Sequence, residues 1–160
     1  MKIFLGTDHA GFELKEAVKR WFREGGGLPA GWQVADEGAF EYVEGDDYPD
    51  FIDIVAKQVE ADPENNRGII FGGSGQGEAI CANRFHRVRA TVFYGGPLDI
   101  LKLSREHNNA NILSIGALFV KEEEAKQAIK LWLDTGFSGD DRHIRRIAKI
   151  DNKLERENFF

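Results

Sequence analysis

The chain has 160 residues, of which 42% are hydrophobic and 30% charged, and its formal net charge is −6. No apolar run approaches the roughly 20 residues that cross a bilayer, and the acidic balance argues against nucleic acid as the main partner. One cysteine excludes an internal disulfide and, without a signal-peptide pattern, leads us to expect a cytoplasmic protein. The length predicts one domain over residues 1–160.

Short apolar runs alternate with segments of helical periodicity along the chain. The predicted strands cover residues 2–8, 32–38, 68–72, 88–94 and 110–117. The predicted helices cover residues 11–24, 49–62, 97–106 and 122–135, with a short one that carries Glu78 and ends near 85, and an amphipathic one at about 140–157. This alternation predicts an α/β fold: a single doubly wound, five-stranded parallel sheet, flavodoxin-like or Rossmann-like, in the order 2-1-3-4-5, with an extra C-terminal helix.

A glycine-rich turn follows the third predicted strand and contains Gly72, Gly73, Gly75 and Gly77. Glycines let the backbone approach a ligand closely, and a helix start offers unpaired N–H donors, so the turn outlines an anion site. The turn also carries the hydroxyl of Ser74, and Glu78 lies in the first turn of the following helix. A carboxylate beside converging N–H groups suits a carbonyl that becomes an enediolate while a base removes the neighbouring proton. The alternative is a structural turn in which the carboxylate only interacts with the helix dipole.

Asp8 and His9 lie where the first predicted strand ends. In a sheet of order 2-1-3-4-5 the first and third strands are neighbours, and ligands bind at the carboxyl ends of parallel strands. Asp8, His9 and the glycine turn would therefore line one pocket. Tyr48, in the loop before the second helix, is a further candidate to line it.

A second set of polar residues lies later in the chain. His107 closes a predicted helix within an asparagine-rich segment that includes Asn108. Arg142 and Arg146 are four residues apart, so they share one helical face and could grip a phosphate group. The alternatives are a histidine that interacts with a helix dipole and a solvated basic face.

No metal site and no cofactor site is predicted. The sequence lacks H-x-H, H-E-x-x-H and paired-cysteine spacings, and it matches neither the P-loop nor the dinucleotide-binding fingerprint. Cys81 lies one turn beyond Glu78 on the same helical face. We expect a small buried residue there, which could also sit near the pocket.

Five motifs occur in order along residues 1 to about 150. They are Gly6-Thr7-Asp8-His9-Ala10-Gly11, Asp47-Tyr48-Pro49, Gly72-Gly73-Ser74-Gly75-Gln76-Gly77-Glu78, Arg105-Glu106-His107-Asn108-Asn109 and Arg142-His143-Ile144-Arg145-Arg146. Together they resemble the type B ribose-5-phosphate isomerase family, which includes the galactose-6-phosphate isomerase subunits. The resemblance implies a cofactor-free, metal-free aldose–ketose isomerase that acts through a cis-enediol, with ribose 5-phosphate to ribulose 5-phosphate as the first expectation.

The resemblance also implies roles for individual residues. Asp8 and His107 would assist sugar-ring opening and proton shuttling. Ser74 and the N–H groups of the loop glycines would stabilise the enediolate, with Tyr48 and Asn108 as further substrate contacts. The phosphate would be held by His9, Arg142 and Arg146.

Two positions distinguish this chain within the resemblance. Many members have a cysteine base directly before the glycine loop, where this chain has Gly72, and another branch uses a glutamate at the position of Glu78, which is therefore the predicted base. Leu118 stands where the family usually has a phosphate-binding arginine, and loss of such a contact costs about 1.5–3 kcal/mol. The alternatives are therefore an isomerase of a six-carbon sugar phosphate and a non-catalytic sugar-phosphate-binding protein.

Assembly follows from topology as well as from the resemblance, which implies a homodimer or a dimer of dimers with the active site at the subunit interface. His107 precedes the fifth strand, so it should lie at the opposite sheet edge from Asp8 and Glu78. A five-residue strand separates those edges by roughly 17 Å, too far for side chains to share one sugar. We therefore expect His107 to reach the site of a partner chain.

Overall fold

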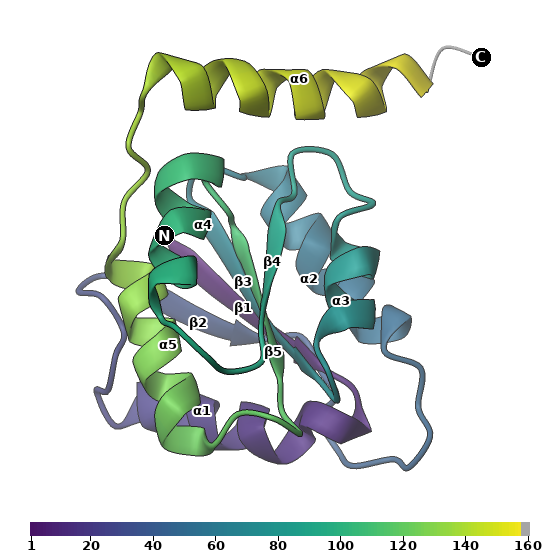
Figure 1. Cartoon of the computed structure of the whole chain (residues 1–160). Helices are drawn as coiled ribbons and strands as arrows, with labels where there is room; N and C mark the ends of the chain where they lie inside the picture. The colour runs from purple at the N-terminus through teal and green to yellow at the C-terminus, as the bar shows by residue number, and fades with distance from the viewer. Residues whose placement is uncertain (158–160) are drawn as a thin grey trace.

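Five parallel strands form the centre of the molecule (Figure 1). The computed structural model describes the backbone of residues 1–157 and the side chains of residues 1–152. The strands are β1 (Lys2–Thr7), β2 (Gln33–Asp36), β3 (Asn66–Gly72), β4 (Ala90–Phe93) and β5 (Ile112–Gly116). Every neighbouring pair is parallel, so the predicted α/β class with a five-stranded parallel sheet is confirmed.

The strand order is β2-β1-β3-β5-β4, so the predicted order 2-1-3-4-5 is wrong for its last two strands. β5 pairs with β3 from Gly68↔Ile112 to Gly72↔Gly116, and β4 pairs with the other side of β5. Every residue of β5 is buried, whereas the first three residues of β4 are partly exposed. The wholly buried strand takes the interior place, where both its faces are covered, and the shorter and more polar β4 forms the edge.

Helices cover both faces of the sheet. They are α1 (Phe12–Arg23), α2 (Pro49–Ala61), α3 (Gln76–Ala82), α4 (Asp99–Asn108), α5 (Glu122–Asp134) and α6 (Asp141–Glu157), with a 3₁₀ turn, η1, at His9–Gly11. One core lies between the sheet and α1, α4 and α5, and a smaller core lies between the sheet and α2 and α3. Two predicted boundaries are corrected: the helix that carries Glu78 ends at Ala82, and α4 extends to Asn108, so that His107 lies in its last turn.

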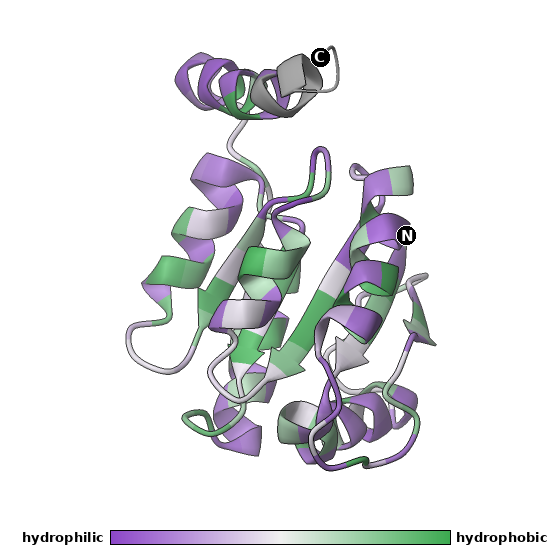
Figure 2. Ribbon diagram, turned by 90° about the vertical axis from the view of Figure 1, so that its right-hand side faces the viewer, coloured by the Kyte–Doolittle hydropathy of each residue, from purple (hydrophilic) through white to green (hydrophobic). Residues whose placement is uncertain are grey.

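Alternate residues of each inner strand face the two cores. Ile69 and Phe71 of β3 belong to the core beneath α1 and α5, whereas Ile70 between them belongs to the core beneath α2. This is the period of two that a strand imposes on its side chains. Figure 2 shows the hydrophobic residues gathered on the central strands, with hydrophilic residues on the outer sides of the helices.

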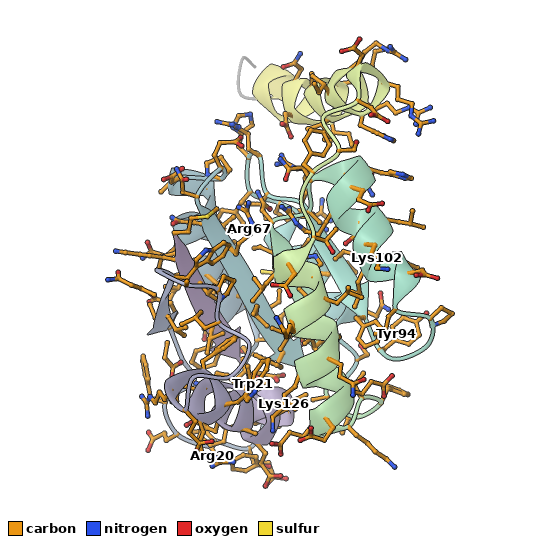
Figure 3. The ribbon with its side chains drawn as sticks, turned by 90° about the vertical axis from the view of Figure 1, so that its left-hand side faces the viewer. Arg20, Trp21, Arg67, Tyr94, Lys102 and Lys126 are labelled. Carbon is orange, nitrogen blue, oxygen red and sulfur yellow. The ribbon has the colours of Figure 1, made fainter. Side chains whose placement is uncertain are left out.

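The C-terminal helix α6 lies apart from the layers, beyond the edge at which the strands begin (Figure 1). The segment that leads to it is tied to α4 by a hydrogen bond from the Ser138 N–H to the Glu106 carbonyl (3.1 Å). Figure 3 marks the two ends of the sheet: Arg67 at the start of β3 lies toward α6, and Tyr94 beyond the end of β4 lies away from it. Ile144 and Ile150 of α6 remain about half exposed, at 50% and 52%.

The predicted domain of residues 1–160 includes residues 158–160, which lie outside the described part of the chain. Over residues 1–157, no helix combines the length and the apolar composition needed to span a bilayer.

Candidate active site

Asp8 and the glycine loop meet at the carboxyl edge of the sheet because β1 and β3 are neighbours. Thr7 and Phe71 are paired in register, so the chain leaves the two strands side by side. The Asp8 carboxylate then caps η1, since its Oδ1 accepts hydrogen bonds from the N–H groups of Ala10 (3.0 Å) and Gly11 (3.3 Å). These bonds hold Asp8, which is 6% exposed, in a fixed position beside the loop.

The loop between β3 and α3 consists of Gly73, Ser74 and Gly75. Gly75 has a φ of 76°, which is the left-handed region that favours glycine. Within residues 1–157, the backbone N–H groups of these three residues donate to no protein acceptor. The Ser74 hydroxyl accepts a hydrogen bond from the Gln76 N–H (3.3 Å). Free donors at a helix start suit an anion or a developing oxyanion.

The loop is tied to the segment that follows β5. The N–H groups of Ala117 and Leu118 donate to the carbonyls of Gly72 (2.8 Å) and Gly73 (3.1 Å). The buried Ser114 hydroxyl donates to the Gly75 carbonyl (2.6 Å). Because β5 lies next to β3 rather than at the sheet edge, these bonds continue the pairing of the two strands beyond their ends.

Glu78 lies in the first turn of α3 and is only 4% exposed. Its carboxyl group occupies the space over Gly72: a Cβ on Gly72 would lie 2.6 Å from Glu78 Oε2 and closer still to Oε1 and Cδ. Burial raises the pKa of Glu78 above its ordinary 4.5, and the negative charge of Asp8 raises it further. A carboxyl group with a raised pKa, beside free N–H donors, suits a base that accepts a proton from carbon and returns it.

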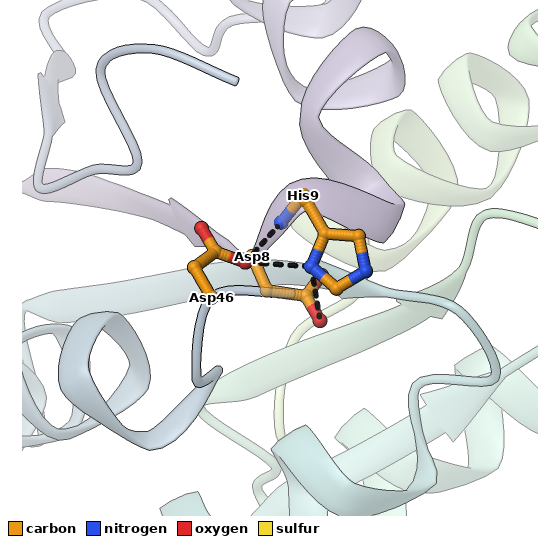
Figure 4. Close-up of side chains that lie close together, drawn as sticks. All are labelled: Asp8, His9 and Asp46. Carbon is orange, nitrogen blue, oxygen red and sulfur yellow. Dashed lines mark hydrogen bonds and ion pairs between the residues drawn. The ribbon is translucent and has the colours of Figure 1, made fainter. Parts of the chain in front are cut away.

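His9 is held by Asp46, a residue of the loop before α2 (Figure 4). Asp46 Oδ1 accepts one hydrogen bond from the His9 backbone N–H (2.8 Å) and lies 2.6 Å from the ring Nδ1. This contact is the largest cause that raises the pKa of His9 above 6.5, with burial opposing it and the charge of Asp8 adding to it. The ring edge of Tyr42 packs on His9 with its centroid 6.2 Å away.

The cluster of Asp8, His9 and Asp46 is dense enough to hold a metal ion, since one ligand atom of each lies within 4.8 Å of the others. The 2.6 Å distance between His9 Nδ1 and Asp46 Oδ1 is nevertheless a hydrogen-bond distance. The proton in that bond occupies the position of the lone pair with which Nδ1 would bind a metal. The geometry therefore favours an ion pair over a metal site.

Tyr48 and Leu118 flank the glycine loop. A Cβ on Gly77 would lie 2.9 Å from Tyr48 Cζ, so the phenol ring closes over the start of α3. The Leu118 side chain is 76% exposed, and its Cδ1 would lie 3.4 Å from a Cβ on Gly73. Leu118 and His9 both line a hollow of about 350 Å³.

The remaining predicted residues gather at the opposite edge of the sheet. His107 and Asn108, at the end of α4, line a hollow of about 240 Å³ together with His143 and Arg146 of α6. The rings of His107 and His143 stack with centroids 4.3 Å apart and an angle of 13°. Burial, and then the neighbouring His107, lower the pKa of His143. Arg142 lies one turn before Arg146 on the exposed side of α6.

The structure thus divides the predicted site residues into two groups. The carboxyl-edge group comprises Asp8, His9, Tyr48, Gly73, Ser74, Gly75, Gly77 and Glu78. The amino-edge group comprises His107, Asn108, Arg142 and Arg146. Each group holds parts that the other lacks: the first has the buried carboxyl group and the free N–H donors, and the second has the arginines.

Cys81 is partly buried rather than fully buried as expected. Its thiol donates to Asp53 Oδ1 on α2 (3.1 Å), and burial together with this carboxylate raises the pKa of the thiol to about 12. A thiol with this pKa stays protonated at neutral pH, so Cys81 is unsuited to act as a base.

Sequence reasoning assigned no function to Asp46, and it gave none to His143. Asp46 lies 37 residues from His9 in a loop without periodicity, so no sequence pattern pointed to their contact. His143 could have been singled out by its spacing, because it lies between Arg142 and Arg146 on a face that turns toward α4.

Comparisons with known proteins identify the family of the chain. The family model described as Ribose/Galactose Isomerase matches residues 3–150. Ribose-5-phosphate isomerase B of Mycolicibacterium paratuberculosis is 39% identical over 147 residues, which cover 92% of this chain and 87% of the relative. The crystal structure of ribose-5-phosphate isomerase B from Mycoplasma genitalium with bound ribulose 5-phosphate has a TM-score of 0.87 and 31% identity over 96% of each chain. The Thermotoga maritima ribose 5-phosphate isomerase structure has a TM-score of 0.83 and 38% identity over 94% of this chain and 97% of that one. The chain therefore belongs to the ribose/galactose isomerase family.

Proposed function

We propose that the chain is an aldose–ketose isomerase that converts ribose 5-phosphate to ribulose 5-phosphate through a cis-enediol. The observation that carries the proposal is the Glu78 carboxyl group, which fills the space over Gly72 beside the free N–H groups of the loop. A protein that only binds sugar phosphate needs no buried base at this point. Family membership and the names of the relatives support the same reaction.

In the proposed mechanism Glu78 removes the proton from C2 of the open-chain sugar and returns it to C1. Negative charge then develops on the former carbonyl oxygen, where the N–H groups of Gly73, Ser74 and Gly75 stabilise it. The Ser74 hydroxyl adds a fourth donor. Asp8, which is fixed by its bonds to η1, moves the proton between the sugar oxygens and assists ring opening.

The amino-edge group supplies the remaining parts from a second copy of the chain. His107 assists ring opening with Asn108 beside it, and Arg142 and Arg146 hold the phosphate together with His9. Support comes from the fold, because His107 lies in the last turn of α4, at the sheet edge opposite Asp8 and Glu78. We therefore propose a homodimer, or a dimer of dimers, with the active site at the subunit interface. We also propose a cytoplasmic location, because a chain with a single cysteine and no internal disulfide suits a reducing compartment.

Leu118 favours one second candidate, an isomerase of a six-carbon sugar phosphate. Its exposed apolar side chain lies beside the loop at the position where the resemblance suggests an arginine. A site with one charged phosphate contact fewer could place the phosphate of a longer sugar differently.

The test is an assay of aldose–ketose conversion with ribose 5-phosphate, allose 6-phosphate and galactose 6-phosphate. We expect the highest kcat/KM for ribose 5-phosphate. A higher value for a six-carbon sugar would move the assignment to the second candidate. Binding of sugar phosphates without conversion of any of them would refute isomerase activity.

A further inference from the structure

We propose that Asp46 is a positioning residue, which holds the His9 ring in one orientation with Nδ1 protonated and presents Nε2 to the phosphate of the substrate. The proposal rests on the proposed function in one respect, namely that His9 contacts the phosphate. It adds Asp46, a residue to which neither the motifs nor the comparisons assign a role.

The geometry fixes His9 at two points. The same carboxylate oxygen, Asp46 Oδ1, accepts from the His9 backbone N–H (2.8 Å) and from the ring Nδ1 (2.6 Å). One bond sets the backbone at the start of η1, and the other sets the rotation of the ring. The carboxylate is well shielded, with 11% of the Asp46 side chain exposed, whereas 30% of the His9 side chain remains open to a ligand. The exposed His9 ring is therefore held in one orientation by a carboxylate that is itself shielded from solvent.

The hydrogen bond also determines which ring nitrogen faces the substrate. An ionised carboxylate only accepts, so Nδ1 must carry a proton. Nε2 is then free, and it can donate to a phosphate oxygen only when the ring is cationic. Asp46 favours that cationic form, and the second carboxylate, Asp8, adds to the effect with its Oδ2 3.9 Å from Nδ1. Asp46 thus supplies both the direction and the charge that a phosphate contact needs.

Few other groups near His9 could orient its ring through a hydrogen bond. Acidic side chains also approach the hollow from α1 and α5, and Tyr42 packs edge-on against the ring; the ionisable groups in and around the hollow are Asp8, Glu13, Tyr42, Asp46 and Glu122. Of these, and within the part of the chain whose side chains are described, only Asp46 lies at hydrogen-bond distance from the His9 ring. The 350 Å³ hollow that His9 lines leaves room for a phosphate group.

The test compares the wild type with Asp46→Asn, which keeps the oxygen acceptor and removes the charge. Glu44→Gln, the same kind of change at an exposed residue of the same loop, is the matched control. The pKa of His9 is measured by NMR titration of the imidazole signals, which are assigned by their loss in His9→Gln. Affinity for inorganic phosphate is measured by titration calorimetry at pH 5.5 and at an intermediate pH, midway between the His9 pKa values that the titration gives for the wild type and the variant. The KM and kcat for ribose 5-phosphate are measured at the same two pH values.

We expect Asp46→Asn to lower the pKa of His9 toward its ordinary 6.5. At the intermediate pH the variant should bind phosphate several-fold more weakly and show a KM raised by a similar factor, because more of its His9 is neutral and no longer donates from Nε2. At pH 5.5, where His9 is protonated in both proteins, the two affinities should converge. The kcat should change less than about threefold at either pH, and Glu44→Gln should match the wild type throughout.

Two results would overturn the proposal. One is an unchanged pKa of His9 in Asp46→Asn, and the other is a loss of phosphate affinity that is equal at pH 5.5 and at the intermediate pH. The titration and the calorimetry need no turnover, so they remain decisive if the chain fails to isomerise ribose 5-phosphate. In that case the assignment of the reaction fails while the role of Asp46 is still tested.

Discussion

Replacement of Gly72 by alanine tests whether the position of the Glu78 carboxyl group governs the reaction. The added Cβ would lie 2.6 Å from Oε2 and closer to Oε1 and Cδ, whereas contacts between carbon and other heavy atoms settle at about 3.5 Å. Gly72 lies outside the left-handed region, so alanine fits its backbone. The group that must move is the end of a flexible side chain, which shifts more readily than backbone. The fold should therefore survive while the carboxyl group moves by at least about 1 Å.

The expected loss follows from that displacement. A misplacement of about 1 Å at a reacting group can cost roughly 10²-fold in rate. Removal of a general base costs roughly 10²–10⁴-fold in rate. The kcat of Glu78→Gln is therefore the lowest value that we expect for Gly72→Ala. The KM for ribose 5-phosphate should change little, because the phosphate contacts do not involve Gly72. The double variant Gly72→Ala/Glu78→Gln should be no slower than Glu78→Gln alone, since both changes act through one carboxyl group.

The assay follows ketose formation from ribose 5-phosphate, with circular dichroism and thermal unfolding as checks on the fold. Gly136→Ala is the matched control, because no atom lies within 4 Å of a Cβ at Gly136. If Gly72→Ala keeps its kcat within about threefold, the carboxyl group is not the base or need not occupy this space. If the double variant is slower than Glu78→Gln by the full factor that Gly72→Ala loses alone, Gly72 has a role that is independent of Glu78.

The remaining predictions concern pH, phosphate and assembly. Since burial raises the pKa of Glu78 above 4.5 and the base must be ionised, activity should be lost as the pH falls through that raised value. Cys81→Ser should be nearly silent, and loss of turnover in Cys81→Ser but not in Glu78→Gln would identify the thiol as the base. Arg146→Ala should raise KM for ribose 5-phosphate by about tenfold and leave the unphosphorylated sugar nearly unaffected; an equal loss for both would remove the phosphate assignment. Glu78→Gln and His107→Ala proteins, each nearly inactive, should recover to roughly a quarter of wild-type activity after subunit exchange, because half of the dimers are mixed and each mixed dimer has one intact site. Exchange without recovery would place His107 and Glu78 in one chain or exclude His107 from the site.

The order of elements could be predicted from the sequence because apolar periodicity is a local signal. The last two strands were misplaced because pairing depends on a comparison between distant segments. Ile112–Gly116 is buried at every position and can lie inside the sheet, whereas Ala90–Phe93 is partly exposed and suits an edge. A simple sequential order of strands overlooks that difference in burial.

The candidate site was predictable to the same extent. The position of Glu78 in the first turn of a helix follows from local spacing, and the structure has it there. The packing of its carboxyl group over Gly72 depends on a side-chain orientation that no spacing specifies. The contact between Asp46 and His9 depends on the path of an irregular loop, which returns a residue 37 positions away to the end of β1.

The hydrogen bonds that link the glycine loop to β5 have an entropic consequence. A glycine-rich segment has more backbone freedom than any other, and a ligand that orders such a segment loses affinity through its conformational entropy. Here the carbonyls of Gly72, Gly73 and Gly75 already accept hydrogen bonds from Ala117, Leu118 and Ser114, respectively. The free N–H groups on the other side of the loop are consequently oriented before any ligand arrives. The loop therefore needs little reorganisation when charge develops on the substrate, and its N–H groups are in place without the closure of a lid.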